Sequence, residues 1–334
     1  PPRYTRPMPP DQTAIVTGAA GFIGSHVSAA LLGRGWRVVG VDSFDAFYER
    51  SMKERNVAAV ASADRSSAFT LVEADIRDAP AMQELYERER PALTVHIAAR
   101  AGVRPSIAAP ALYSSVNVEG TTVLLEAARR SAPVAPFLMA SSSSVYGNND
   151  KTPFAEDDPV EAPISPYAAT KRSCELIART FHELYGMPIA CIRFFTVFGP
   201  RQRPDLAIAK FMRLIRAGRP IPVFGDGSMS RDYTYIDDIV AGVLAAAERI
   251  ESHGYRIWNL GSDRPVRLDD MISSIGRVLE ARPIIERLPV PPGDVLRTYA
   301  DLTRSRSELG YEPATEFEEG LRAQAHSDEG VVNS

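Results

Sequence analysis

Residues 13–24 read Thr-Ala-Ile-Val-Thr-Gly-Ala-Ala-Gly-Phe-Ile-Gly, a short apolar run that passes through three glycines into a helix-forming segment. Glycines spaced G-x-x-G-x-x-G let the backbone turn tightly and approach a pyrophosphate at a helix N-terminus, where the N–H groups and the helix dipole favour an anion. A strand, a glycine loop and a helix in this order predict a dinucleotide-binding βαβ unit. The expected cofactor contacts from this loop are Gly18, Gly21, Phe22, Ile23 and Gly24.

The second strand-like run, Arg37–Val41, is followed directly by Asp42. A carboxylate at this place accepts hydrogen bonds from the adenosine ribose hydroxyls and repels a 2′-phosphate, which favours NAD over NADP. The alternative is an ordinary turn aspartate, but the glycine loop that precedes it favours the ribose role. Residues that follow the third and fourth strands face the same ligand crevice. Further expected cofactor contacts are Asp75, Ile76, Ala98, Ala99 and Asn117.

Short apolar runs alternate with helix-period segments across about the first 260 residues. The apolar runs are 14–17, 37–41, 69–73, 94–97, 137–140, 189–195 and 255–260, and the main helical segments are 24–35, 79–90, 118–131 and 167–185. This βαβα order predicts an α/β fold of the Rossmann type, in which helices cover both faces of a doubly wound parallel sheet.

From about residue 200 onward, proline- and glycine-rich loops with shorter elements replace this rhythm. We therefore expect residues 12–196 and about 233–262 to form the nucleotide-binding domain. A smaller, discontinuous C-terminal domain for the substrate is expected to comprise about 197–232 and 263–322. The proline-rich residues 1–11 and the tail 327–334 are expected to be disordered.

Composition narrows the class of protein. The 334 residues are 45% apolar and 24% charged, which is ordinary for a globular chain, and no stretch approaches the roughly 18 to 20 apolar residues of a membrane span. A formal net charge of −4 argues against nucleic acid as a partner. Two cysteines, five scattered histidines and an N-terminus without an apolar core indicate no disulfide framework, no metal site and no secretory signal. We expect a cytoplasmic protein.

The segment 165–171, Ser-Pro-Tyr-Ala-Ala-Thr-Lys, carries the first candidate catalytic pair. Serine followed by proline is a favourable helix start. Tyr167 and Lys171 are then four residues apart on one helix face. A cationic lysine beside a tyrosine favours the phenolate, which can act as a general base.

A run of four serines, 141–144, follows the fifth apolar run. A hydroxyl at this strand end can donate a hydrogen bond to a substrate alcohol or ketone and share its proton with the tyrosine. A serine run taken alone is more often a polar turn. The glycine loop, Asp42, the serines and the Tyr/Lys pair together, in this order, favour a dinucleotide-dependent catalytic site.

Over about residues 12–322 the chain resembles the extended short-chain dehydrogenase/reductases, in particular their nucleotide-sugar epimerase/dehydratase group. Within that group it is most similar to the UDP-glucuronate 4-epimerases. The stretches that carry the resemblance are ARAGVRPS (99–106), SSSSVYG (141–147), YAATK (167–171), RFFTVFGPRQRPDLA (193–207) and RDYTYIDDIV (231–240), of which the fourth discriminates best.

The resemblance implies an NAD-dependent homodimer with Ser142, Tyr167 and Lys171 as catalytic residues. It also implies interconversion of UDP-glucuronate and UDP-galacturonate through transient oxidation at C4 and a 4-keto intermediate. UDP-glucose 4-epimerase and UDP-glucuronate decarboxylase are the close alternatives. A non-catalytic NAD-binding scaffold is the alternative from a different class, and it would not need the Ser/Tyr/Lys set.

Substrate contacts follow at the other end of the site. Arg203 is the candidate for the substrate carboxylate, because a guanidinium can bind a carboxylate through two parallel hydrogen bonds. A solvated arginine is the alternative in so arginine-rich a chain. Ser143 and Thr196 are auxiliary donors. By resemblance, Arg231 would bind the diphosphate, Asp294 the uridine ribose, and the loop 224–227 would cover the uracil.

The chain departs from the group's patterns at three places. Ser143-Ser144 stands where the dehydratases carry an Asp-Glu pair, so the groups for eliminating water are missing. Arg100 replaces a glutamine expected in the glucuronate epimerases, and Arg201-Gln202 replaces a segment that usually contains an aromatic residue. These differences concern the pocket and leave the expected reaction class unchanged.

Overall fold

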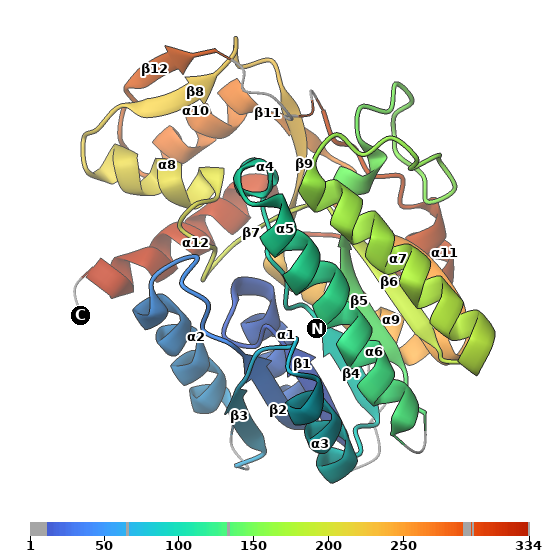
Figure 1. Cartoon of the computed structure of the whole chain (residues 1–334). Coiled ribbons are helices and arrows are strands. Elements are labelled where there is room, and N and C mark those ends of the chain that lie inside the picture. Colours follow the sequence, from blue (N-terminus) through green and yellow to red (C-terminus); the bar gives the residue numbers. More distant parts are fainter. Residues whose placement is uncertain (1–11, 65–66, 132–133, 290–294, 296, 333–334) are drawn as a thin grey trace.

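The structure, a computed structural model, describes residues 12–64, 67–131, 134–289, 295 and 297–332. Seven parallel strands form the central sheet in the order β10-β6-β5-β4-β1-β2-β3 (Figure 1). The strands are β1 (Thr13–Thr17), β2 (Arg37–Asp42), β3 (Phe69–Glu73), β4 (Leu93–His96), β5 (Phe137–Ser142), β6 (Ile189–Phe194) and β10 (Tyr255–Leu260). The predicted parallel, doubly wound sheet is confirmed.

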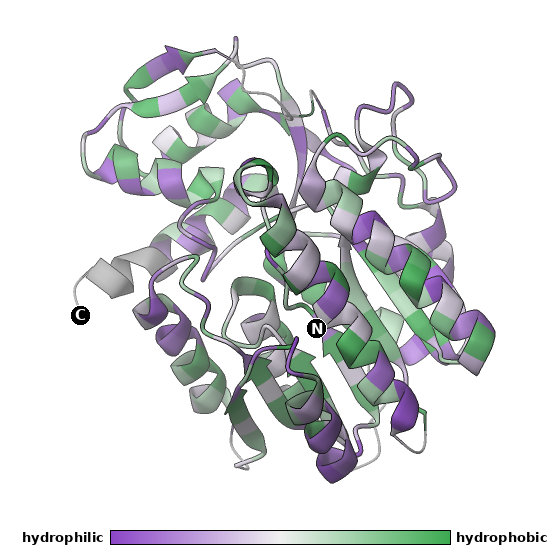
Figure 2. Ribbon diagram, viewed as in Figure 1, coloured by the Kyte–Doolittle hydropathy of each residue, from purple (hydrophilic) through white to green (hydrophobic). Residues whose placement is uncertain are grey.

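Helices cover both faces of this sheet. One face packs against α1 (Phe22–Gly33), α2 (Arg50–Ala63) and α9 (Ile236–His253), and the other against α3 (Ala79–Glu89), α6 (Gly120–Arg130) and α7 (Pro166–Tyr185). The central strands are predominantly apolar, whereas polar residues gather on the outer side of α3 (Figure 2). Strands buried on both faces are expected to be continuously apolar, and this explains why the short runs were readable in the sequence.

The reversal of strand order beside β1 positions the site. The chain adds β2 and β3 on one side of β1, and then β4, β5, β6 and β10 on the other. Connections that leave β1 and β4 in opposite directions open a crevice beyond their C-terminal ends.

A smaller part of the molecule lies beyond this edge of the sheet (Figure 1). It contains the three-stranded sheet β11-β9-β7 and the pair β12-β8. Its elements are β7 (Thr196–Phe198), α8 (Ala207–Arg216), β8 (Ile221–Phe224), β9 (Ser230–Tyr235), β11 (Pro265–Arg267), α10 (Leu268–Val278), β12 (Ile285–Leu288) and α12 (Phe317–Val332). The remaining elements are α4 (Val103–Ala108), α5 (Pro110–Tyr113), a π-helical turn (Ser114–Glu119), a 3₁₀ turn (Ser143–Tyr146) and α11 (Thr303–Leu309).

The C-terminal segment corrects one expectation. Residues 327–332, expected to be disordered, continue α12. Leu321 and Ala325 anchor this helix in the core of the smaller part, and extending a helix that has already formed gains one hydrogen bond for each residue that is fixed. Residues 1–11, 333 and 334 lie outside the described residues, and the proposed domain boundaries stay predictions.

No helix in the described ranges has the length and the hydropathy needed to cross a membrane.

Gly24 offers a test of the first turn. A Cβ at Gly24 would lie 2.1 Å from the carbonyl oxygen of Gly18, whereas Gly33, at the other end of the same helix, has open space around it. We expect Gly24→Ala to lower the free energy of unfolding by about 1–3 kcal/mol through overpacking. Gly33→Ala should leave it unchanged or raise it by up to about 1 kcal/mol. Thermal unfolding of the two variants checks this, and equal stability of both would contradict the close approach.

Candidate active site

A cavity of about 460 Å³ opens at the C-terminal ends of the parallel strands. Its walls come from the glycine turn, from the ends of β2 to β5, from the start of α7 and from the segment that follows β6. Sixteen of the residues predicted from the sequence line it: Gly18, Gly21, Phe22, Ile23, Gly24, Asp42, Asp75, Ile76, Ala98, Ala99, Ser142, Ser143, Tyr167, Lys171, Thr196 and Arg203. Chain segments far apart in sequence therefore meet at one concave surface.

The glycine turn is shaped for close backbone approach. Gly18 has a φ of +71°, and a Cβ at this position would lie 2.8 Å from the backbone nitrogen of Ala98. Only glycine meets both constraints without strain. The turn leaves β1 and reaches α1 with its backbone exposed to the cavity, as a pyrophosphate site requires.

Asp42 is buried at the end of β2 with its carboxylate fixed. One oxygen accepts a hydrogen bond from the Ala20 nitrogen at 3.1 Å, and the other accepts from the Phe44 nitrogen at 2.9 Å. Lys53 Nζ lies 3.7 Å from the carboxylate. An ionised carboxylate has about four acceptor positions, so Asp42 retains capacity for two ribose hydroxyls. The residues at this end of the cavity fit a dinucleotide.

The predicted catalytic residues meet where β5 ends beside α7. Ser165 caps α7, because its Oγ accepts a hydrogen bond from the Ala168 nitrogen at 3.2 Å. Lys171 is buried and its Nζ donates to the Ala140 carbonyl at 2.7 Å. Ser142 Oγ accepts from the Ser144 nitrogen at 3.2 Å, which orients the hydroxyl at the strand end. Ser142, Tyr167 and Lys171 all face the same cavity.

The environment of Arg203 was not apparent from the sequence. Its Nε and Nη2 donate to the two carboxylate oxygens of Asp205 at 3.0 and 2.7 Å. Its guanidinium also lies 5.1 Å from the centroid of the Phe47 ring. Asp205 therefore occupies one edge of the Arg203 guanidinium. A ligand carboxylate must bind through the other N–H groups of the guanidinium or displace Asp205. The side chain nevertheless lies at the cavity wall.

Arg100 fastens the segment between β2 and α2 to the cavity. Its Nη2 donates to Asp45 at 2.8 Å, and its guanidinium lies 5.4 Å from the centroid of Phe47. Asp45, Phe47 and Tyr48 of this segment line the cavity too, as does Lys53 in the first turn of α2. None was predicted, because nothing in their spacing marks a ligand site. The only signals were Lys53, one of four lysines, and the unexpected arginine at position 100.

Asn117 lies behind the wall and not among the residues that line the cavity. It is buried in the π-helical turn, where its Oδ1 accepts from the Arg100 nitrogen at 2.7 Å and its Nδ2 donates to the Arg100 carbonyl at 3.0 Å. The structure thus shows Asn117 positioning the backbone at Arg100.

The remaining substrate candidates lie beside the main cavity or outside the described residues. A second cavity of about 160 Å³ is lined by Arg231 and shares Ser143 and Thr196 with the main one. Arg231 Nη2 donates to the Val295 carbonyl at 2.6 Å. Asp294 lies outside the described residues.

A doubly wound parallel sheet with a glycine turn, an acidic residue at the end of β2 and a Ser/Tyr/Lys set at one cavity defines a dinucleotide-dependent enzyme of the short-chain dehydrogenase/reductase type. The chain belongs to the NAD dependent epimerase/dehydratase family, whose model matches residues 14–261.

Known relatives lie within this family. UDP-glucuronate 4-epimerase 3 of Arabidopsis thaliana is 41% identical over 96% of this chain and 77% of its own length. UDP-glucuronate 4-epimerase of Thermodesulfobacterium geofontis is 38% identical over 92% of this chain and 93% of its own length. Among solved structures, UDP-glucuronic acid 4-epimerase from Bacillus cereus, in complex with UDP-glucuronic acid and NAD, superposes with a TM-score of 0.89. Its sequence is 33% identical, and the match covers 96% of this chain and 100% of that chain.

Proposed function

We propose that the protein is a UDP-glucuronate 4-epimerase, which interconverts UDP-glucuronate and UDP-galacturonate with NAD as its cofactor. The observation that carries the proposal is the placement of Arg203 in the same cavity as Ser142, Tyr167 and Lys171. The named relatives, which match nearly the whole chain, support it. In this proposal the large sheet binds NAD and the smaller part binds the UDP sugar.

Three residues of this chain act at the sugar 4-hydroxyl. Tyr167 takes the proton of the sugar 4-hydroxyl, and Lys171 lies one helical turn further along α7 at the same cavity. Ser142 donates a hydrogen bond to the oxygen as it becomes a ketone. NAD, when bound, supplies an acceptor that takes the C4 hydride and gives it back, so the reaction has no net redox change. Inversion at C4 requires the hydride to return to the opposite face of the 4-keto sugar, and Tyr167 would then give its proton back to the C4 oxygen.

Arg203 addresses a problem of selectivity. With a ketone at C4 and a carboxylate on C5, the intermediate is a β-keto acid, which loses CO₂ when the carboxylate stands perpendicular to the carbonyl plane. A guanidinium already fixed by Asp205 and Phe47 can hold the carboxylate in one orientation. We propose that this orientation is the unreactive one. A decarboxylase would use the same contact with the other orientation.

Incubation of the purified protein with UDP-glucuronate, followed by proton NMR without added cofactor, tests the reaction. We expect UDP-galacturonate to form without CO₂ or NADH. A UDP-pentose product would indicate decarboxylation instead. Turnover of UDP-glucose alone would favour a UDP-glucose 4-epimerase. If no product forms, NAD is added and the incubation is repeated, because NAD can be lost during purification.

Tyr167→Phe separates an enzyme from a scaffold that only binds NAD. Loss of the phenolate should lower the rate by about 10²- to 10⁴-fold, while the NAD retained per chain stays at the wild-type level. Tyr86→Phe is the matched control, since that buried hydroxyl bonds Thr94 away from the cavity. Unchanged turnover in Tyr167→Phe would remove the assigned base.

Arg203→Ala tests the carboxylate contact. Loss of a charge-assisted contact should lower kcat/KM for UDP-glucuronate by about 10- to 100-fold. Any activity on UDP-glucose, which has no carboxylate, provides the internal control and should be retained. If kcat/KM fell equally on both substrates, or on neither, Arg203 would have no role in recognising the carboxylate.

We also propose a homodimer built on the outer faces of α6 and α7. Leu176 and Leu184, eight residues apart on one face of α7, are 52% and 70% exposed. Two exposed leucines about two turns apart on the outer side of one helix suit a helix–helix contact with a second copy.

Sedimentation of a Leu176→Glu, Leu184→Glu double variant tests this surface. We expect the wild type to sediment as a dimer and the double variant as a monomer, because two buried carboxylates would oppose the contact. Ile284→Glu, at a residue 53% exposed on the smaller part, should remain dimeric. A monomeric wild type would refute the proposal.

A location in the cytoplasm completes the proposal. Cys174 and Cys191 are buried free thiols, and burial raises the pKa of both. Free thiols suit a reducing compartment.

A further inference from the structure

A fully buried ion pair lies behind the catalytic residues. Glu175 is 0% exposed and Arg193 is 1% exposed. Arg193 Nε and Nη2 donate to the two carboxylate oxygens of Glu175 at 2.8 and 3.0 Å. Glu175 belongs to α7, four residues after Lys171 and eight after Tyr167, so the three side chains share one helix face.

The ion pair is joined to the end of β5. Ser141 Oγ donates to Glu175 Oε1 at 2.6 Å, and Ser141 is also the register partner of Arg193 on β6. One residue earlier, the Ala140 carbonyl accepts from Lys171 Nζ. α7 is thus attached to β5 at two successive residues, and Ser142 is the next residue along the strand.

Two arginines donate hydrogen bonds to the Glu175 carboxylate. Besides Arg193, Arg172 Nη1 donates to Glu175 at 3.0 Å. Burial opposes ionisation, but the hydrogen bonds and the charge of Arg193 outweigh it and hold the pKa of Glu175 below its ordinary value. Arg193 also donates to the Glu156 carbonyl at 3.2 Å and lies 4.8 Å from the centroid of the Tyr146 ring.

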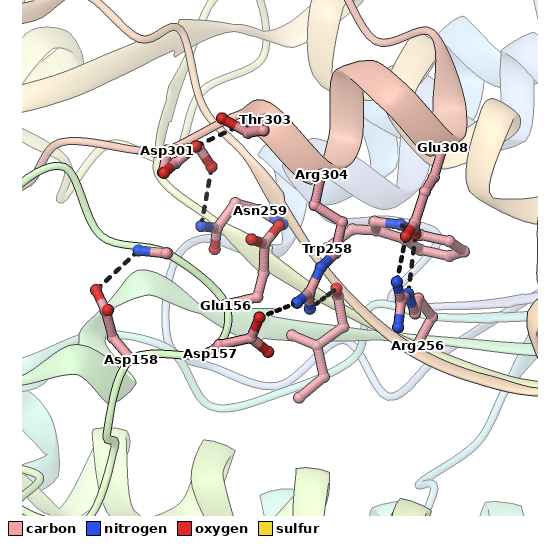
Figure 3. A network of polar contacts seen from close by, with 12 residues as sticks. Glu156, Asp157, Asp158, Arg256, Trp258, Asn259, Asp301, Thr303, Arg304 and Glu308 are labelled. Carbon is pink, nitrogen blue, oxygen red and sulfur yellow. Dashed lines mark hydrogen bonds and ion pairs between the residues drawn. The ribbon is translucent and has the colours of Figure 1, made fainter.

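Glu156 connects the ion pair to a second polar network, drawn in Figure 3. There the Asn259 nitrogen donates to Glu156 Oε1 at 2.8 Å. Glu308 on α11 accepts from Trp258 Nε1 at 2.8 Å and from Arg256 Nε at 2.9 Å. Glu308 does not line either cavity.

A buried ion pair is a poor way to gain stability, because the cost of desolvating two charges offsets most of their attraction. An apolar pair of similar volume would stabilise the fold as well. An ion pair with two hydrogen bonds adds direction, since it holds the carboxylate and the guanidinium in one relative orientation.

We propose that Glu175 and Arg193 are positioning residues for the reaction, holding α7 against the end of β5 so that Tyr167 and Lys171 stay aligned with Ser142. The proposal rests on the proposed epimerase function. It assigns the ion pair an effect on rate that is separable from its effect on stability.

Glu175→Gln is the primary variant, with Glu308→Gln as the matched control. Glu175→Gln should lower kcat by about tenfold or more, because small misplacements of reacting groups are costly. KM for UDP-glucuronate and the NAD retained per chain should stay within about twofold of wild type. The primary isotope effect with substrate deuterated at C4 should rise as hydride transfer becomes more rate-limiting. Glu308→Gln should lower the Tm without changing kcat.

The double variant Glu175→Leu, Arg193→Met tests the proposal if Glu175→Gln fails to fold. An apolar pair should recover the Tm while kcat stays low. Wild-type kcat in this variant, or in Glu175→Gln, would overturn the proposal.

Hydrogen exchange separates this proposal from the function on which it rests. Failure of the wild type to convert UDP-glucuronate would count against the epimerase. The positioning role would then be decided by amide exchange in residues 137–147 and 166–176. Exchange there should quicken in Glu175→Gln and remain at wild-type rates in Glu308→Gln. Unchanged exchange in both variants would overturn the positioning role.

Discussion

Gly18 brings the backbone that leaves β1 against the backbone at the end of β4, with room for no side chain between them. β1 and β4 are hydrogen-bonded neighbours, and the contact lies just beyond them, where the sheet reverses its order. It also places the first turn of α1 over the crevice, where N–H groups and the helix dipole favour an anion. Asp42 is fixed by the same turn, since it accepts a hydrogen bond from Ala20. The geometry of the cofactor end therefore depends on a backbone contact.

The chain has a net charge of −4, yet cationic side chains are placed locally at its cavity, where they suit an anionic cofactor such as NAD. Lys53, Lys171, Arg100 and Arg203 all line the main cavity. Arg100 and Arg203 are each held by a carboxylate of this chain and by the ring of Phe47. Such pairing fixes the positive charges before a ligand arrives, so less entropy is lost on binding.

The sequence was most informative where one physical constraint dominates. Buried parallel strands must be apolar, so the five inner strands of the main sheet were readable, and the glycine spacing located the cofactor turn. The edge strands β3 and β10 were also found, although β10 is only partly buried and no residue of β3 is fully buried. Helix α2 was missed because it buries only three residues, Lys53, Asn56 and Val60, and has little apolar periodicity. The helical end of α12 was missed because its anchor, Leu321 and Ala325, lies one to two turns upstream.

Side-chain partners at the site were less predictable than the positions themselves. The sequence identified Arg203 but not Asp205, which occupies one edge of its guanidinium. The sequence proposed a cofactor contact for Asn117, which stays a prediction, but it did not indicate that Asn117 holds the backbone of Arg100. Contacts of this kind arise from the packing of segments distant in sequence, here the segment after β2, the π-helical turn and the loop after β6. The spacing of residues within one segment therefore cannot predict these contacts.

The path of the chain between the two parts limits how such a molecule can change. It leaves the large sheet after β6, returns in α9, leaves again after β10, returns in α11 and ends in α12 on the smaller part. Each sheet of the smaller part is assembled from segments separated by elements of the larger one. A recombination event at a single breakpoint would leave both parts incomplete. New substrate preferences on this scaffold are therefore accessible mainly through exchange of individual side chains at the cavity wall, and hardly through exchange of a whole module.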